Sequence, residues 1–203
     1  MGEEMSGKSA VRTELLDARG LLSTKDVQEA AAVLARHALE LPELTGATTV
    51  AAYVSVGREP GTRALLDALH ARGIRVLLPV LLPDNDLDWG VYRGADHLVR
   101  AGRGLLEPDG ERLGPHAVVE AGAVLLPGLA VDAHGMRLGR GGGSYDRVLA
   151  RLAAAGADPA LVVLLYANEV VERIPVEPHD HPVHAVVTPE GVTRFSRPPR
   201  PSA

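Results

Sequence analysis

The residue types best suited to chemistry gather between positions 126 and 147. This stretch contains four glycines within five positions and three arginines around them: Gly139, Gly141, Gly142, Gly143, Arg137, Arg140 and Arg147. Glycine lets a backbone approach a phosphate closely, and the N–H groups at a helix start point toward an anion. Guanidinium groups add permanently charged, forked donors that suit phosphate oxygens. The stretch therefore predicts a phosphate-binding bend, with a flexible surface turn as the alternative.

The elements around this bend favour an anion site. An apolar run at 123–126 predicts a buried strand before the bend, and residues 145–155 predict a helix after it. The known phosphate fingerprints do not match, because there is no Gly-Lys-Ser/Thr and the spacing of a dinucleotide loop is absent. A serine nucleophile at Ser144 is not supported either, since the sequence around it is not Gly-x-Ser-x-Gly.

A second candidate is Glu59, which follows the apolar run 49–55 and precedes a helix expected over 64–71. Ligands of open parallel sheets bind at the carboxyl ends of the strands. Glu59 is therefore a candidate ligand contact, or else an ordinary solvated carboxylate. Thr62 is expected to cap the helix that follows.

Two aspartates are candidate magnesium ligands. The run His179-Asp180-His181 invites a metal interpretation, but neighbouring side chains diverge and three consecutive residues rarely bind one ion. Mg²⁺ keeps several waters and takes one or two carboxylates plus substrate phosphates, which suits Asp180 together with Asp146. Asp146 could equally be a first-turn acid that complements the helix dipole.

The amino-terminal stretch predicts a helix over 8–19, with Lys8 and Arg12 on the same face because they are four residues apart. The pair is either a phosphate contact or a solvated basic edge. A second helix is expected to start at Ser23, where Ser23 and Asp26 have capping-box spacing.

Composition limits the function classes. The chain has 203 residues, no cysteine and a net charge of −5. Disulfides, thiolate zinc sites and cysteine nucleophiles are excluded, and the charge and the absence of a basic run argue against nucleic-acid binding. No apolar stretch approaches a membrane span. We expect a cytoplasmic protein with one domain over 1–203 and loose ends at 1–6 and 195–203.

Strand and helix patterns alternate along the chain. Strands are expected at 49–55, 74–79, 123–126, 161–166 and 185–188, with a possible edge strand at 87–92; residues 117–119 either start a strand or lead into one. This order predicts an α/β fold, a mainly parallel twisted sheet flanked by helices on both faces, as in a Rossmann-like three-layer sandwich. The Glu59 loop and the glycine bend both follow strands, so they can face one cleft.

Four stretches in order resemble the 5-formyltetrahydrofolate cyclo-ligase family (methenyltetrahydrofolate synthetase). The longest is Leu-Pro-Gly-Leu-Ala-Val-Asp…Gly-Met-Arg-Leu-Gly-Arg-Gly-Gly-Gly-Ser-Tyr-Asp-Arg at 126–147. The others are Lys8-x-x-x-Arg12, Tyr53-Val54-Ser55…Glu59-x-x-Thr62 and Pro175-x-Glu177-x-His179-Asp180. The resemblance spans nearly the whole chain, and its central motif is long and specific.

The resemblance implies an ATP- and Mg²⁺-dependent ligase of folate one-carbon metabolism. ATP would phosphorylate the formyl oxygen of 5-formyltetrahydrofolate, N10 would attack the activated carbon, and 5,10-methenyltetrahydrofolate, ADP and phosphate would result. Such phosphoryl transfer needs positioning and charge neutralisation, and no protein nucleophile. Partners would be these small molecules alone, and we expect a monomer.

The resemblance also implies a role for individual residues. Arg140 and Tyr145 would be catalytic, and Asp146 and Asp180 would hold magnesium. The ATP-binding residues would be Lys8, Arg12, Arg137, Leu138, Gly139, Arg140, Gly141, Gly142, Gly143, Ser144 and Tyr145. The folate-binding residues would be Val54, Glu59, Arg140, Gly141, Gly142, Gly143 and Ser144.

Ser144 departs from the family pattern, in which an aromatic residue usually stands at that position. The protein could therefore bind folate differently, or be a nucleotide-binding homologue without catalysis. A further alternative is a phosphate-ligand isomerase or transferase on a related fold, which would turn over without ATP.

Overall fold

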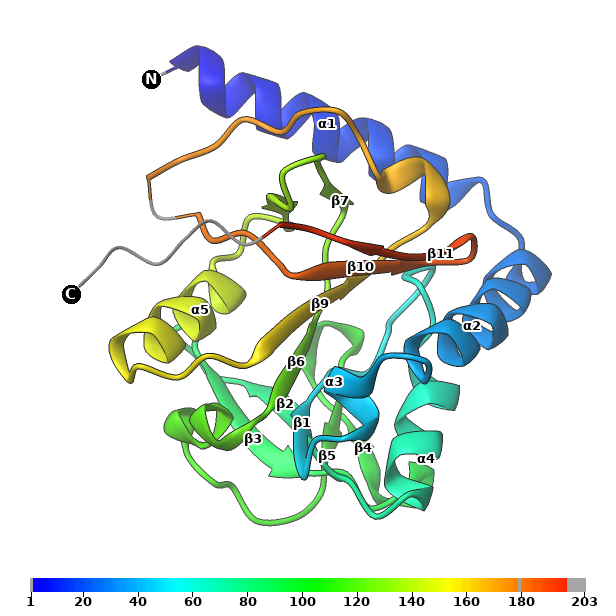
Figure 1. Cartoon of the computed structure of the whole chain (residues 1–203), viewed down its shortest axis with the longest axis vertical. Coiled ribbons are helices and arrows are strands. Elements are labelled where there is room, and N and C mark those ends of the chain that lie inside the picture. Colours follow the sequence, from blue (N-terminus) through cyan, green and yellow to red (C-terminus); the bar gives the residue numbers. More distant parts are fainter. Residues whose placement is uncertain (1, 179, 197–203) are drawn as a thin grey trace.

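A seven-stranded sheet forms the centre of the molecule (Figure 1). The computed structural model describes residues 2–178 and 180–196, and for residues 2–6 the backbone alone. The strand order is β11-β10-β9-β6-β1-β2-β3. The strands are β1 (Thr49–Ala51), β2 (Arg75–Leu81), β3 (Leu87–Val91), β6 (Ala123–Leu126), β9 (Ala160–Leu164), β10 (Ala185–Thr188) and β11 (Gly191–Arg194). The five inner strands are parallel, and the edge strands β3 and β11 are antiparallel to their neighbours.

Helices cover both faces of this sheet, as the alternation of strands and helices predicted. Alternate residues of β1 divide between two cores: Val50 packs with residues of α2 (Thr24–Ala38), α3 (Pro42–Thr45) and α4 (Arg63–Ala71). Ala51 packs on the opposite face with α5 (Ser144–Ala154) and the 3₁₀ helix η3 (Pro115–Glu120). Because the parallel strands are buried on both faces, they appear in the sequence as continuous apolar runs.

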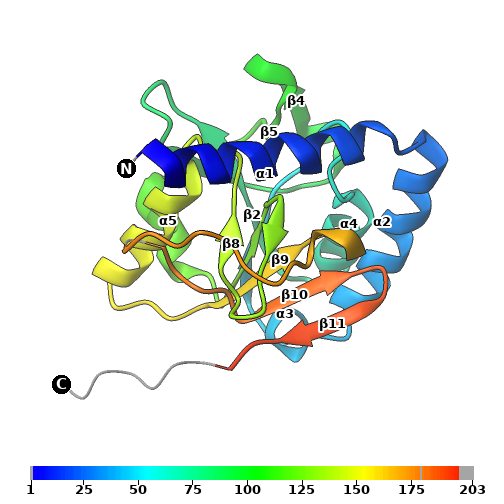
Figure 2. The same ribbon diagram turned by 90° about the horizontal axis from the view of Figure 1, so that it is seen from above.

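The first helix, α1 (Gly2–Gly20), lies outside these two layers. Leu15 of α1 packs in a smaller core with Leu129, Leu138 and Ile174. Part of this core is the ribbon of β7 (Ala130–Val131) and β8 (Arg137–Leu138), which follows the carboxyl end of β6. Seen from above in Figure 2, α1 crosses the molecule over β8 and the sheet. The helix thus covers the edge of the sheet at which the glycine bend lies.

The order of the strands reverses between β1 and β6. The chain passes from β1 through α4 to β2 on one side, and from β6 through α5 to β9 on the other. The loops that follow the neighbouring strands β1 and β6 therefore run in opposite directions along the sheet. Open α/β sheets bind ligands between two such loops, at the carboxyl ends of the strands. The Glu59 loop follows β1, and the glycine bend follows β6.

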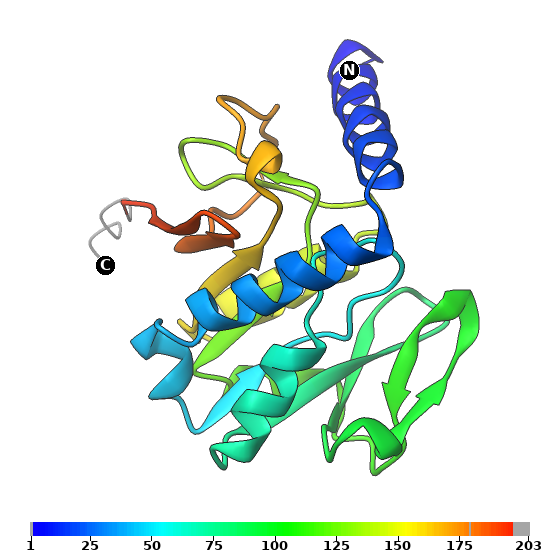
Figure 3. The ribbon, with the colours of Figure 1, turned by 90° about the vertical axis from the view of Figure 1, so that its right-hand side faces the viewer.

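The middle of the chain adds a small separate hairpin. Its strands are β4 (Leu98–Arg100) and β5 (Leu106–Pro108), with 3₁₀ turns η1 (Ala95–His97) before it and η2 (Gly102–Gly104) at its tip. Figure 3 shows the hairpin standing beside the main sheet. A last 3₁₀ turn, η4 (Ala167–Glu169), follows β9. Within the described residues, no helix has the length and apolar character needed to cross a bilayer.

Several local predictions need correction. Of the two alternatives for residues 117–119, the structure shows the second, because they belong to η3 and lead into β6. The backbone of residues 2–6 is helical rather than loose. Strand β11 was not predicted, because its four residues carry no apolar alternation long enough to stand out. The carboxyl end is ordered as far as Phe195, whose N–H donates to the carbonyl of His184; residues 197–203 lie outside the described part. The capping box is confirmed, with Ser23 and Asp26 bonded reciprocally at 3.0 Å.

Candidate active site at the carboxyl edge of the sheet

Helix α1 holds the glycine bend from outside. Arg12 donates from Nε to the carbonyl oxygen of Gly139 at 2.8 Å. A Cβ on Gly141 would come within 3.3 Å of the same guanidinium, and Gly141 has a φ of +95°. Only glycine satisfies both demands at this position. The contact between the first helix and the bend therefore depends on the absence of a side chain at residue 141.

Arg137 lies beneath the bend, with a side chain only 7 % exposed. Its Nη1 donates to the carbonyl oxygen of Pro127 at 2.8 Å, and its Nη2 lies 3.7 Å from Oδ1 of Asp146. Its buried Nε has no partner among the described residues. Burial lowers the pKa of Arg137, and the charges of Asp146 and Asp180 oppose that shift. Arg137 is therefore a buried cation with donor capacity left for a ligand.

Glu59 faces the bend from the neighbouring loop. Its Oε1 lies 3.6 Å from Nη2 of Arg140, and its Oε2 accepts a hydrogen bond from the N–H of Val56 at 3.1 Å. The Glu59 side chain is 12 % exposed, whereas that of Arg140 is 56 % exposed. Burial raises the pKa of Glu59, and the Val56 hydrogen bond and the Arg140 charge only partly offset it. The two predicted site loops thus meet at this pair of side chains.

The Glu59 loop is held in shape by Thr62. Its hydroxyl donates to the carbonyl of Tyr53 at 2.8 Å and accepts from the N–H of Ser55 at 2.9 Å, while the Thr62 N–H donates to Oγ of Ser55 at 3.0 Å. Thr62 is the N-cap residue of α4, as predicted, but its hydroxyl makes no cap hydrogen bond. The hydroxyl is instead fully used in closing the loop, which fixes the position of Glu59.

Three of the four tyrosines surround Glu59. The pKa values of Tyr53 and Tyr145 are raised mainly by burial and then by the negative charge of Glu59. The pKa of Tyr166 is raised to about 12, also mainly by burial, and its hydroxyl donates to the carbonyl of Arg58 at 2.9 Å. All three are neutral hydroxyls at physiological pH. The sequence singled out Tyr145 as a site residue but not Tyr53 or Tyr166, although the scarcity of aromatic residues was a signal.

Lys8 joins α1 to the loop around residue 180. Its Nζ lies 3.3 Å from Oε2 of Glu177 and 3.4 Å from Oδ2 of Asp180. The Asp180 carboxylate also accepts from the N–H of Glu177 at 2.8 Å. Lys8 and Arg12 thus reach from α1 to two of the predicted site segments, the loop around residue 180 and the glycine bend. In this structure, however, each already has a protein partner.

The two predicted magnesium ligands approach the same cation. Asp146 lies beside Arg137, and the charge of Asp180 also acts on that guanidinium. No cluster of three metal-ligating side chains occurs within the described ranges, from which His179 is left out. Mg²⁺ needs only one or two carboxylates when phosphates complete its shell, so these two residues fit a hydrated magnesium. His181 is exposed and does not join them.

Other predicted residues are distributed unevenly. Leu138 and Val54 are buried in the cores and shape the site through packing. Ser144 begins α5 and is half-buried at the bend. Arg147 does not line the bend: its Nη1 donates to the carbonyl of Asp84 at 2.6 Å, so it fastens α5 to another loop.

Sequence reasoning missed a buried ion pair beside the site. Arg19 donates from Nε to Oε2 of Glu169 at 2.7 Å and from Nη2 to Oε1 at 3.0 Å. The same Nη2 donates to the carbonyl of Gly128 at 2.7 Å. Nothing local marks this pair, because its members are 150 residues apart.

Comparison with known proteins identifies the family of the chain. Residues 4–189 match the 5-formyltetrahydrofolate cyclo-ligase family. The chain belongs to this family. A 5-formyltetrahydrofolate cyclo-ligase of Mycolicibacterium smegmatis is 43 % identical over 90 % of this chain and 94 % of its own. That of Escherichia coli K12 is 33 % identical over 86 % and 96 %.

A solved structure extends the likeness to the fold. The 5,10-methenyltetrahydrofolate synthetase of Aquifex aeolicus is 27 % identical, covers 97 % of this chain and 96 % of its own, and superposes with a TM-score of 0.79. The likeness of fold therefore extends over nearly the whole chain.

Proposed function

We propose that this cyclo-ligase converts 5-formyltetrahydrofolate and ATP into 5,10-methenyltetrahydrofolate, ADP and phosphate. The names of its relatives support the reaction. The observation that carries the proposal is the 3.6 Å approach of Arg140 to Glu59, since it joins a phosphate-type bend to a carboxylate suited to a pterin. A carboxylate can accept paired N–H donors from an aminopyrimidine edge.

ATP binds at the bend in this proposal. The N-cap of α5 is Gly143, which offers no side-chain cap, so the first N–H groups of the helix can receive phosphate oxygens. Arg137 supplies a buried positive charge below them, and Arg12 and Lys8 supply further charge from α1. Lys8 would exchange its carboxylate partners for phosphate when the nucleotide arrives.

Asp146 and Asp180 hold magnesium in this proposal, together with phosphate oxygens and water. Bound there, the ion would neutralise charge on the transferring phosphoryl group. Without it, Asp146 and Asp180 would repel the nucleotide, and only the neighbouring cations Arg137 and Lys8 would offset them.

The chemistry then needs positioning more than it needs a reactive side chain. The formyl oxygen attacks the γ-phosphorus and ADP leaves. N10 attacks the activated carbon and loses its proton, and the phosphate departs with the former formyl oxygen. The guanidinium of Arg140 stabilises the negative charge that develops on the transferred phosphoryl group. Tyr145 stays neutral because its pKa is raised, so it acts as a hydrogen-bond donor rather than as a base.

Finer features belong to the same proposal. We infer a single domain with a Rossmann-like arrangement, supported by the reversal of strand order between β1 and β6. We also propose a monomer that acts in the cytoplasm, a location supported by the bacterial relatives. Light scattering of the pure protein tests the monomer.

The test is the appearance of the methenyl product, which absorbs in the near ultraviolet. The protein mixed with 5-formyltetrahydrofolate, ATP and Mg²⁺ should generate this absorbance, and omission of ATP should abolish it. Glu59→Gln should raise the KM for the folate by roughly 10- to 100-fold, as expected for loss of a charged hydrogen-bond partner. The matched control Glu120→Gln changes an exposed carboxylate paired with Arg75 and should leave the KM unchanged. No product from the folded wild type would refute the proposal, and product without ATP would favour an ATP-independent phosphate enzyme.

A further inference from the structure

A hollow lies on the same edge of the sheet as the proposed active site. It has a volume of about 290 Å³ and lies between the carboxyl end of β2, the loop at 82–85 and the tip of the β4–β5 hairpin. Its walls are mainly apolar, from Leu81, Leu82, Pro83 and Leu105. Sites for whole small molecules usually measure about 300–1,000 Å³, so this hollow suits part of a ligand better than a complete one.

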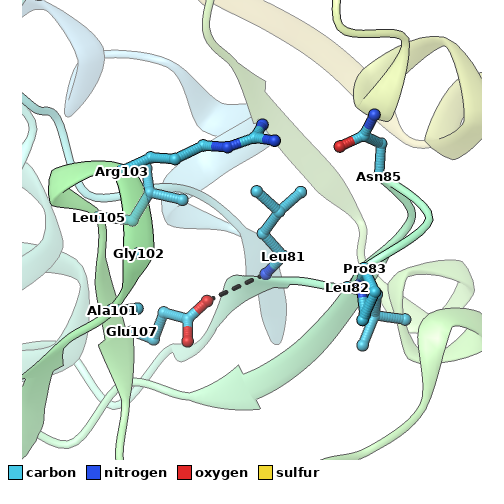
Figure 4. A pocket seen from close by; sticks show the side chains of 9 residues that line it. All are labelled: Leu81, Leu82, Pro83, Asn85, Ala101, Gly102, Arg103, Leu105 and Glu107. Atoms are coloured by element: carbon cyan, nitrogen blue, oxygen red, sulfur yellow. Dashed lines mark hydrogen bonds between the residues drawn. The ribbon is translucent and has the colours of Figure 1, made fainter.

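The polar groups of the hollow are distributed unequally. Figure 4 shows Arg103 and Asn85 extending toward each other from opposite walls above Leu81. Glu107 lies lower and is already engaged, because its Oε2 accepts from the N–H of Leu81 at 3.0 Å. Arg103 is exposed and has no hydrogen bond or ion pair with any residue that the structure describes. The mouth therefore offers a cation and an amide above an apolar floor.

The acids of the neighbouring loop at 82–86 are paired with arginines. In the loop at 82–86, Asp84 lies 3.7 Å from Nη1 of Arg147, and Asp86 receives both Nη groups of Arg151 at 2.6 and 3.1 Å. Both arginines belong to α5, which begins directly after the glycine bend. Among the lining residues that the structure describes, Arg103 is therefore the cation at the mouth, and Glu107 is a carboxylate held lower down by the N–H of Leu81.

The hollow also borders the strand next to the one that the Glu59 loop follows. Strand β2 is the neighbour of β1, and Leu77 pairs with Ala51 at the end of β1. Leu81 lies four residues further along β2, which is about 13 Å at about 3.3 Å per residue. A long ligand anchored at the Glu59 loop can therefore extend across this edge into the hollow.

We infer that the hollow holds the aminobenzoyl-glutamate part of the folate, with Arg103 binding the glutamate carboxylates. This inference rests on the proposed function and adds a residue that determines substrate specificity. The flat aminobenzoyl ring packs on the leucines, and the forked guanidinium suits a carboxylate at the mouth. Arg103 has a φ of +60°, an uncommon conformation for a residue with a side chain, and it stands at the hairpin tip beside the hollow.

The test compares two substrates in the absorbance assay. Arg103→Ala should raise the KM for 5-formyltetrahydrofolate about tenfold, with kcat and the KM for ATP unchanged. Arg100→Ala is the matched control, because it removes the same charge from an exposed position of the same hairpin outside the hollow. With 5-formyltetrahydropteroate, which lacks the glutamate, all three proteins should have the same KM. Arg103→Gly, which suits the positive φ, should reproduce the alanine result and show that strain is not the cause.

Two results would overturn the inference while the proposed function stands. One is an Arg103→Ala enzyme with the KM of the Arg100→Ala control. The other is an equal penalty on the substrate without glutamate. Failure of the wild type to form product from either substrate would remove the proposed function, and this inference with it.

Discussion

Arg19 and Glu169 form a two-pronged ion pair in which both side chains are 5 % exposed or less. The pair joins α1 to the turn that follows β9, and its guanidinium also holds the carbonyl of Gly128 after β6. Glu169 further accepts from the N–H of Tyr166. One contact thus fixes α1 over two strand ends, and α1 carries Lys8 and Arg12 to the site. The helix is therefore positioned by a buried charge pair as well as by its small apolar core.

Breaking this pair should destabilise the protein strongly. Arg19→Met leaves the Glu169 carboxylate buried without its cation, which costs about 3–5 kcal/mol. Urea unfolding followed by circular dichroism measures the loss. Lys25→Met is the control, since Lys25 and Glu29 form an exposed helical pair whose loss should cost less than about 1 kcal/mol. Equal effects of the two substitutions would mean that the buried pair does not hold α1.

The stability contributed by Glu59 should depend on pH. Burial raises the pKa of Glu59 above the ordinary value of 4.5, so ionisation costs more in the folded chain than in the unfolded chain. Its stabilising contribution is complete below pH 4.5 and is lost as the pH rises through the folded pKa. Glu59→Gln should therefore unfold at higher urea concentration than the wild type at pH 7, with the difference shrinking toward pH 4.

Asp86 provides the opposite case. The hydrogen bonds from Arg151 lower its pKa, so its contribution is present above the ordinary value of 3.8 and is lost as the pH falls through the folded pKa. Asp86→Asn should destabilise the protein at pH 7 and progressively less in acid. The same trend for the Glu59 and Asp86 substitutions would contradict the assignment of burial as the dominant effect on Glu59.

The sequence predicted the features that depend on local pattern. The parallel strands are continuous apolar runs because both of their faces are covered. The bend could be recognised because several glycines occur close together in the sequence, which an ordinary helix or strand does not require. Ser23 and Asp26 could be paired because a capping box is a contact between residues three apart. Such features follow from neighbouring residues alone.

Contacts that form only in the tertiary structure could not be predicted from local sequence patterns. Arg19 and Glu169 meet only after the sheet has assembled, and no spacing rule relates them. Thr62 has the right residue type and position for a helix cap, yet its hydroxyl donates to the carbonyl of Tyr53 within the loop that carries Glu59. Arg147 resembles a phosphate ligand beside the bend, but the rotation of α5 directs it to Asp84. In each case the local sequence is compatible with several partners, and the tertiary structure determines which of them is within reach.

Chelation of magnesium should abolish product formation, and added Mg²⁺ should restore it. Asp146→Asn removes one of the two proposed carboxylate ligands, so the Mg²⁺ concentration for half-maximal rate should rise by at least about tenfold, the cost found even for outer-sphere partners. Asp96→Asn, in the exposed turn η1, is the control and should leave the Mg²⁺ requirement unchanged. If the Mg²⁺ requirement of Asp146→Asn were unaltered, Asp146 would not be a magnesium ligand. Its role would then be its contact with Arg137 and its interaction with the amino-terminal end of α5.

The glycine bend allows a comparison between adjacent positions. Gly141 has a φ of +95°, and a Cβ added there would lie 3.3 Å from the Arg12 guanidinium, whereas a Cβ on Gly142 meets open space. Gly141→Ala should therefore cost about 1–3 kcal/mol and lower the Tm by at least about 2 °C, while Gly142→Ala should leave the Tm nearly unchanged. Because Arg12 must move to admit the methyl group, Gly141→Ala should also raise the KM for ATP. Equal Tm values for the two variants would show that the bend tolerates a side chain at residue 141, and that Arg12 does not depend on its absence.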